Sequence, residues 1–200
     1  MIALIDYGIG NLRSVQKALA AVGGEIVLTS DANEIRQADK VILPGVGAFG
    51  DGMTGLVDRG LIEVITEVVQ GQVPILGICL GMQLFFVASE EAPSQPGLGL
   101  LPGTVRRFSG EGLKVPQTGW NQLHPLQGTP LLAGLEDGCY AYFNHGYYCA
   151  PVEAGDTLAV TDYGLRYASV VGRGRLFGVQ FHPEKSQAVG LQILRNFVEL

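Results

Sequence analysis

The first half of the chain alternates short apolar runs with helix-length segments, and this alternation limits the folds that the chain can adopt. Residues 12–22 and 56–69 repeat apolar side chains at helical spacing, and a third helix is expected from Leu80. Before, between and after them lie the strand-like runs MIALIDY, EIVLT, KVILP and VPILGIC. Strands separated by helices pair in parallel, with a helical layer on each face of the sheet. The pattern predicts ligand binding at the carboxyl ends of these strands.

The second half of the chain has a different pattern, in which strand-like runs follow one another with turn residues between them. These runs are GTVRRF, KVPQTGWNQL, CYAYFNHGYYC, DTLAVTD, YASVVGR and RLFGVQF. They favour antiparallel pairing, and the last two predict a hairpin that turns at residues 172–174. Residues 90–97 read as an exposed loop, and residues 187–200 as a closing helix with a core-facing side. We expect a single-domain α/β fold: a central, mostly parallel sheet flanked by helices, with an added antiparallel region.

Composition and charge exclude several classes of protein. Two hundred residues can bury a core without disulfides or a structural metal. The net charge of −6 repels nucleic acids and anionic membrane surfaces, and no stretch reaches 18 apolar residues. The N-terminus also lacks the basic flank and apolar run of a signal peptide. These features predict a cytoplasmic protein, and the apolar fraction of 47% indicates a surface covered by a protein partner.

The three cysteines form no CxxC pair, which argues against a disulfide framework or a zinc site. Cys139 and Cys149 flank an aromatic segment and are expected to be structural. Cys79 lies in Gly-Ile-Cys-Leu-Gly between a strand and a helix, the layout of a nucleophile elbow with cysteine in place of serine. The helix N-terminus would favour the reactive thiolate, and the Leu80 N–H could donate to an oxyanion. The motif alone does not distinguish this nucleophile from a buried cysteine that closes a strand.

A general base is the second requirement, and the segment FHPE supplies a candidate. His182 and Glu184 leave the same side of an extended chain, with Pro183 fixing the backbone between them. Glu184 can therefore orient the imidazole as the acid of a catalytic triad does. The pair alone could also be a surface ion pair. Its combination with the cysteine elbow favours a Cys-His-Glu triad.

Three other features are weaker candidates for function. His124 precedes a proline in an expected turn, and His145 lies among aromatic residues, where it would line a pocket or pack. Residues 45–50, GVGAFG, match the dinucleotide-binding pattern G-x-G-x-x-G. However, the next strand does not end in an acidic residue, and the fingerprint normally opens the first βαβ unit. We interpret PGVG as a turn beside the elbow that presents a backbone N–H.

The motifs GICLGMQ and FHPEKS resemble those of the class I (triad) glutamine amidotransferases, whose fold is flavodoxin-like. The segments DYGIGNLRSV, LPGVGAFGDGM and GWN narrow the resemblance to glutaminase subunits of imidazole glycerol phosphate synthase. It covers essentially the whole chain and implies a glutamine amidotransferase type 1 domain over residues 1–200. It implies no cofactor and no metal. The implied partner is the (β/α)8-barrel cyclase subunit of the same enzyme, in a heterodimer.

The resemblance also implies a reaction and the residues that carry it out. Cys79 would attack the side-chain amide of L-glutamine, His182 would transfer protons, and Glu184 would orient His182. The released ammonia would pass to the cyclase, which makes imidazole glycerol phosphate and AICAR in histidine biosynthesis. The implied oxyanion donors are the N–H groups of Leu80 and Val46. The implied substrate contacts are Gly47, Gln83, His145, Gly146 and Tyr147. The implied interface residues are Asn11, Trp120 and Lys185.

The chain departs from the family pattern in two places, and other classes of function stay open at this point. Gln117-Thr118 and the FNHGYY segment, with Asn144 and Gly146, replace the usual residues at their positions. A cysteine peptidase of related fold would carry histidine directly after the nucleophile, where this chain has Leu80. A nucleotide-binding protein rests on GVGAFG alone. A catalytically silent partner-binding subunit is distinguished only by its chemistry.

Overall fold

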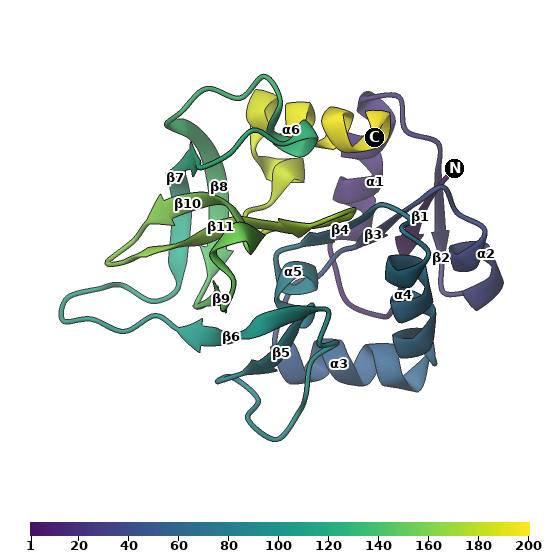
Figure 1. Ribbon diagram of the computed structural model, residues 1–200, viewed down its shortest axis with the longest axis horizontal. Coiled ribbons are helices and arrows are strands. Elements are labelled where there is room, and N and C mark those ends of the chain that lie inside the picture. Colours follow the sequence, from purple (N-terminus) through teal and green to yellow (C-terminus); the bar gives the residue numbers. More distant parts are fainter.

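A twelve-stranded mixed sheet forms the centre of the computed structural model, which describes residues 1–200 (Figure 1). Its parallel half has the order β2-β1-β3-β4-β12, with bounds Ile26–Thr29, Ile2–Ile5, Lys40–Leu43, Ile75–Ile78 and Leu176–Val179. The antiparallel half continues through β11, β10, β7 and β8, with bounds Arg166–Arg173, Thr157–Asp162, Gln117–Pro125 and Cys139–His145. A branch of β9, β6 and β5 leaves β11, with bounds Tyr147–Pro151, Leu101–Arg107 and Phe86–Ser89. The predicted α/β class is confirmed.

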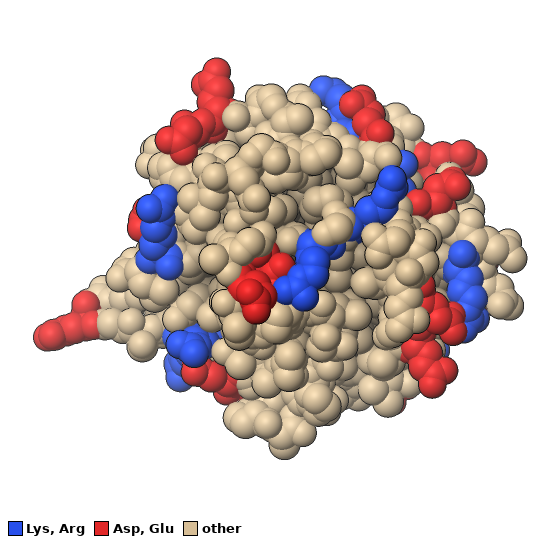
Figure 2. All heavy atoms as spheres, viewed as in Figure 1, with Lys and Arg blue, Asp and Glu red and all other residues tan.

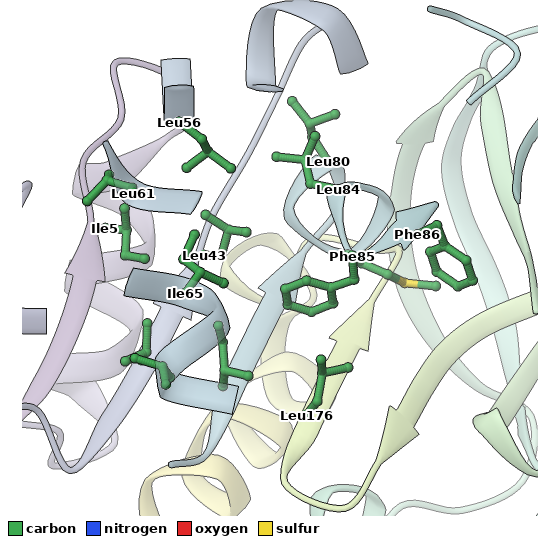
Figure 3. Close-up of a cluster of buried hydrophobic side chains, with 14 of the residues drawn as sticks. Ile5, Leu43, Leu56, Leu61, Ile65, Leu80, Leu84, Phe85, Phe86 and Leu176 are labelled. Carbon is green, nitrogen blue, oxygen red and sulfur yellow. The ribbon is translucent and has the colours of Figure 1, made fainter. Parts of the chain in front are cut away.

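Helices cover both faces of the parallel half (Figure 1). On one face lie α1 (Leu12–Ala21) and α6 (Gln187–Glu199), and on the other α2, α3, α4 and α5, with bounds Ala32–Arg36, Phe49–Asp58, Leu61–Gln70 and Leu80–Leu84. Three short 3-10 helices, η1, η2 and η3, span Pro130–Leu132, Ala154–Asp156 and Pro183–Lys185. Because strand side chains alternate between faces, each strand of the parallel half contributes to two separate cores. Figure 3 shows the core beneath α3, α4 and α5, where Leu43 of β3 packs among helix side chains such as Leu56 and Leu61.

The predicted long helix over residues 56–69 is wrong, because two helices occupy this region. Gly60 adopts a left-handed conformation, with φ of +64°, and separates α3 from α4. The apolar spacing continues across the break, since Leu56 and Leu61 are both fully buried. The short elements α2 and β5 were not predicted. Asp31 caps α2 by accepting hydrogen bonds from the backbone N–H groups of residues 33 and 34.

Strand β12 joins the two halves of the sheet. It pairs antiparallel with β11, as predicted, although the turn lies at Gly174-Arg175, slightly later than expected. It also pairs in parallel with β4, with Val179 opposite Ile78. Parallel neighbours end at the same edge of a sheet. The segments that follow β4 and β12 therefore emerge side by side, although they are about a hundred positions apart in the sequence.

Several smaller predictions can be compared with the structure. Residues 90–97 form a loop, as expected, and the inner side of α6 is buried through Ile193, Leu194 and Phe197. His124 lies within β7 and not in a turn, and its Nδ1 lies 2.9 Å from Oδ1 of Asp137. None of the helices combines the length and apolar content needed to cross a membrane.

Candidate active site

Cys79 lies between the end of β4 and the start of α5, in a strained backbone turn. Its φ of +53° is in the left-handed region, which a non-glycine residue seldom adopts. The two flanking glycines are required by close packing. A Cβ on Gly77 would lie 2.6 Å from the Phe85 ring, and one on Gly81 would lie 1.9 Å from the carbonyl oxygen of Leu43. The strained turn that the sequence predicts at this position is therefore confirmed.

His182 reaches this turn because β12 lies beside β4. The Cys79 N–H donates to the carbonyl of Val179 over 2.8 Å, and His182 follows three residues later. The imidazole lines the same cavity as Cys79, and its Nδ1 lies 2.9 Å from Oε1 of Glu184. The His182 and Glu184 side chains are only 4% and 1% exposed. The alternative interpretation of this pair as a surface ion pair is therefore wrong.

Electrostatics favour a charged histidine in this arrangement. Burial alone would lower the pKa of His182, but hydrogen bonds and charges from Cys79 and Glu184 raise that pKa to about 10. Oε2 of Glu184 has no hydrogen-bond partner, so Nδ1 of His182 is the hydrogen-bonding contact of this buried carboxylate. A charged imidazole that is held by a carboxylate beside a cysteine is suited to activate that cysteine as a nucleophile.

A cavity of about 280 Å³ opens over Cys79. Its lining includes Val46, Gly47, Cys79, Leu80, Gln83, Glu91, Asn144, His145, Gly146, Tyr147 and His182. Every residue that the resemblance implies for oxyanion or substrate binding lines this cavity. The structure thus brings together segments that are scattered over more than a hundred positions of the sequence.

The turn that contains Val46 and Gly47 packs directly against the elbow. A Cβ on Gly45 would lie 2.6 Å from the Tyr7 hydroxyl and 2.8 Å from Cβ of Leu80. Gly47 has φ of +98°, which glycine adopts readily. The interpretation of PGVG as a turn beside the elbow is therefore confirmed.

Glu91 is a site residue that the sequence interpretation missed, because residues 90–97 read only as an exposed loop. Its Oε2 accepts a hydrogen bond from the Phe49 N–H over 2.8 Å, which holds the carboxylate at the cavity wall. No local pattern distinguishes Glu91 from Glu90. The two residues are distinguished only by the contact that Glu91 makes with the first turn of α3.

A larger cavity, of about 650 Å³, lies at the opposite end of β4 and β12. It is lined by residues that precede these strands, among them Pro74 and Arg175. Its buried acid, Asp156, is held by Arg173 through two hydrogen bonds of 2.9 and 2.6 Å. Since no cysteine, serine or histidine lines this cavity, its size does not make it the reaction site.

His145 lies in the cavity wall but is poorly suited to act as a base. Burial lowers its pKa to about 4, although a hydrogen bond to the carbonyl of Tyr147 opposes the shift. The ring packs edge-on against Tyr167, at a centroid distance of 5.5 Å. The expectation that His145 lines a pocket and packs is confirmed.

This lowered pKa predicts a loss of stability in acid. The unfolded chain binds a proton at His145 near the ordinary pKa of 6.5, whereas the folded chain resists protonation down to about 4. The free energy of unfolding should therefore fall by about 3 kcal/mol as the pH drops through this window. A His145→Gln variant should lack that component in urea titrations at pH 7 and pH 4. The matched control is His124→Gln, whose ring is partly exposed; equal acid losses in both variants would contradict the assignment.

The residues implied for a partner interface lie on or near the surface. Trp120, the only tryptophan, is 47% exposed, so its alternative interpretation as a core residue is wrong. Its ring meets Tyr142 edge-on at 6.0 Å, and Nζ of Lys185 lies 5.7 Å from the centroid of the Tyr142 ring. Asn11 is partly buried and precedes α1, which packs against η3.

The face of the molecule seen in Figure 2 has no extended patch of one charge sign. Figure 2 shows acidic and basic side chains mixed in small groups among uncharged surface.

Cys139 and Cys149 are free thiols. No group of three histidine, cysteine or acidic side chains is placed to hold a metal ion.

Comparisons with known proteins agree with this geometry. Residues 3–200 match the model of the family described as glutamine amidotransferase class-I. The chain is 52% identical to imidazole glycerol phosphate synthase subunit HisH of Moorella thermoacetica, over 100% of this chain and 94% of that protein. It is 49% identical to the same subunit of Symbiobacterium thermophilum, over 98% and 92% of the two chains.

Solved structures support the fold independently. A crystal structure of a glutamine amidotransferase superposes with a TM-score of 0.78 at 20% identity, over 100% of this chain and 98% of that chain. PurLQS from Thermotoga maritima superposes with a TM-score of 0.77 at 19% identity, over 99% and 97%. Taken with the family match and the relatives that are about half identical, these findings show that the chain belongs to the class-I glutamine amidotransferase family.

Proposed function

We propose that residues 1–200 form one glutamine amidotransferase type 1 domain, which hydrolyses the side-chain amide of L-glutamine and supplies ammonia for histidine biosynthesis. The observation that carries this proposal is the buried His182–Glu184 pair beside Cys79, under a cavity of amino-acid size. The names of the relatives support the pathway. The reaction takes place in the cytoplasm, where thiols stay reduced, and all three cysteines of the chain are free.

The chemistry proceeds through a thioester. The Cys79 thiolate attacks the amide carbon of glutamine, and the oxyanion that forms is stabilised by the N–H groups of Leu80 and Val46. His182, held by Glu184, gives its proton to the departing nitrogen, and ammonia leaves. His182 then takes a proton from water, whose oxygen attacks the thioester. Collapse of this second tetrahedral species releases glutamate and restores the thiolate.

Substrate recognition uses the other residues of the cavity. Gly47, Gln83 and the segment His145-Gly146-Tyr147 contact glutamine. Glu91 offers the α-ammonium group of glutamine a carboxylate, whose Oε1 is left free when Oε2 accepts from Phe49. A charge-assisted hydrogen bond of this kind distinguishes an amino acid from a simple amide.

An assay of glutamate release tests both the function and the substrate contact. Relative to the wild-type chain with its cyclase partner, Glu91→Gln should raise KM for glutamine about 30-fold, because it removes the charge that faces the ammonium group. Glu90→Gln is the matched control: Glu90 is the neighbouring acid, but it accepts from the Arg107 N–H and does not line the cavity. Equal KM values for the two variants would contradict the contact. A wild-type complex that releases no glutamate would contradict the function itself.

A cyclase partner follows from the relatives, which are subunits of imidazole glycerol phosphate synthase. We assign this partner a (β/α)8 barrel that docks on Asn11, Trp120 and Lys185 and receives ammonia directly. The half-exposed Trp120 supports this assignment, because aromatic anchors are enriched at protein interfaces. We expect the Val46 N–H to turn toward the oxyanion only when the partner has bound its nucleotide, so the isolated chain should release glutamate far more slowly.

A further inference from the structure

Gln180 is a buried polar residue to which the mechanism above gives no role. It lies directly after β12 and two residues before His182, with no exposed surface. Its backbone N–H donates to the carbonyl of Ser169 over 2.9 Å, which fixes its position against β11. Its side-chain Nε2 lies 3.7 Å from Sγ of Cys79. A buried amide in contact with the reacting sulfur is unlike an ordinary core residue.

The orientation of this amide is determined by a neighbouring carbonyl. Nε2 of Gln83 lies 3.3 Å from the carbonyl oxygen of Tyr147, which can only accept a hydrogen bond. The same Nε2 lies 3.1 Å from Oε1 of Gln180. Since the Gln83 NH2 group faces both oxygens, the Gln180 amide must turn its own NH2 group toward Cys79. The Tyr147 carbonyl thus orients the Gln83 amide, and the Gln83 amide orients the Gln180 amide. As a result, an N–H of Gln180 points toward the sulfur of Cys79.

The Tyr147 carbonyl is itself firmly placed. It also accepts from Nδ1 of His145 over 2.6 Å, so both of its lone pairs are engaged. The two hydrogens on Nε2 of Gln83 are likewise committed, one to Tyr147 and one to Gln180. Only the Oε1 atom of Gln83 remains for a ligand in the cavity, where it can accept but not donate.

We propose that Gln180 is a positioning residue that stabilises Cys79 as a thiolate and aims its sulfur, through an amide relay anchored on the Tyr147 carbonyl. A thiolate accepts hydrogen bonds more strongly than a thiol, so a fixed N–H donor favours the charged form. Its amide supplies the sulfur with an N–H donor, next to the charged His182 ring. This inference rests on the proposed function only for the role of Cys79 as nucleophile.

The other ionisable groups near Cys79 do not compete for this role. Burial raises the pKa values of Tyr7, Cys149 and Tyr167, and the nearby Cys79 raises them further. All three therefore stay neutral near pH 7. The groups that can stabilise a negative charge on the sulfur are the His182 ring, backed by its carboxylate, and the Gln180 amide.

Alkylation of Cys79 by iodoacetamide tests the proposal in the full-length chain. The rate is followed from pH 5 to pH 10 by mass spectrometry of the peptide that contains Cys79. Gln180→Met keeps the size of the side chain and removes the donor. Its alkylation rate at pH 7 should fall about fivefold, with the midpoint of the pH profile displaced upward and the high-pH plateau unchanged. A profile that superimposes on that of the wild-type chain would overturn the proposal.

Two further variants separate the relay from a general disturbance of packing. Asn196→Leu is the matched control, because Asn196 is a buried amide that donates to the carbonyls of Leu131 and Ala133 and has no contact with the relay. Its profile should follow the wild type, and a displacement as large as that of Gln180→Met would count against the proposal. Gln83→Met leaves Gln180 in place but frees its amide to rotate, and a smaller slowing at pH 7 is expected. An unchanged rate in Gln83→Met would reject the relay even if Gln180→Met did not fold.

The alkylation experiment does not use glutamine, so its outcome is independent of the glutaminase assay. If Gln180→Met slows alkylation but the wild-type chain with its cyclase partner releases no glutamate, the proposed function is refuted and the relay is left intact. Normal glutamate release with no effect of Gln180→Met on alkylation would do the opposite.

Discussion

Replacing Cys79 with alanine should reduce glutamate release by the cyclase complex by at least about 10⁴-fold. Without sulfur no thioester can form, and no other nucleophile of comparable reactivity lines the cavity. The variant should fold, since the substitution removes only one buried atom. Alanine must adopt the same left-handed φ of +53° that cysteine adopts, so the backbone strain at this position is unchanged. Glutamate release at saturating glutamine is the measurement.

The same variant provides its own control through the partner reaction. When ammonia is added in place of glutamine, the complex of Cys79→Ala should form imidazole glycerol phosphate at the wild-type rate, because the cyclase uses ammonia. Loss of both reactions would indicate a failure of assembly. Glutamate release above about 1% of the wild-type rate would show that Cys79 is not the nucleophile.

A second large effect is expected at Glu184. The Glu184→Gln substitution should lower kcat/KM for glutamine by about 10³-fold, because a neutral amide cannot stabilise the imidazolium and can turn its NH2 group toward Nδ1. Glu184 is 1% exposed and hydrogen-bonds only to His182, so no water or other charge can replace it readily. The pKa of His182 should fall as well, since Glu184 is one of the groups that raise it to about 10.

The control for this variant is Glu136→Gln, on an exposed turn. The pH profile of kcat/KM distinguishes loss of charge from loss of structure. In Glu184→Gln the histidine should lose its proton at lower pH, so the limb of the profile that reports His182 should move toward acid. A wild-type rate, or a reduced rate with an unmoved profile, would contradict the orienting role of Glu184.

Local patterns in the sequence predicted those parts of the fold and site that depend on neighbouring residues. The strand at residues 75–78, the glycine-flanked turn at Cys79 and the spacing of His182 and Glu184 are of this kind, because strand period and turn chemistry act over a few positions. The pairing of β12 with β4 has no such local signal, although it brings the two halves of the site together. Strand neighbours far apart in sequence are selected by packing of the whole sheet.

The failures have similar physical causes. Apolar spacing continued through residues 56–69 and concealed the left-handed break at Gly60. Glu91 and Gln180 carry polar groups whose role depends on contacts with Phe49 in one case and Gln83 in the other. Neither contact leaves a periodic pattern. The only sequence signal for Gln180 was a buried glutamine within an apolar strand segment. This signal does not show which groups the side chain faces.

The most direct test of the central claim is to trap the covalent intermediate. The cyclase complex is mixed with glutamine, quenched in acid during the first turnovers, and digested for mass spectrometry. Acid preserves a thioester, so the peptide that contains Cys79 should carry one γ-glutamyl group, while those with Cys139 and Cys149 remain unmodified. The test requires conditions in which the thioester forms faster than it is hydrolysed. Under these conditions, glutamate formation at the wild-type rate with no adduct on Cys79 would contradict the account.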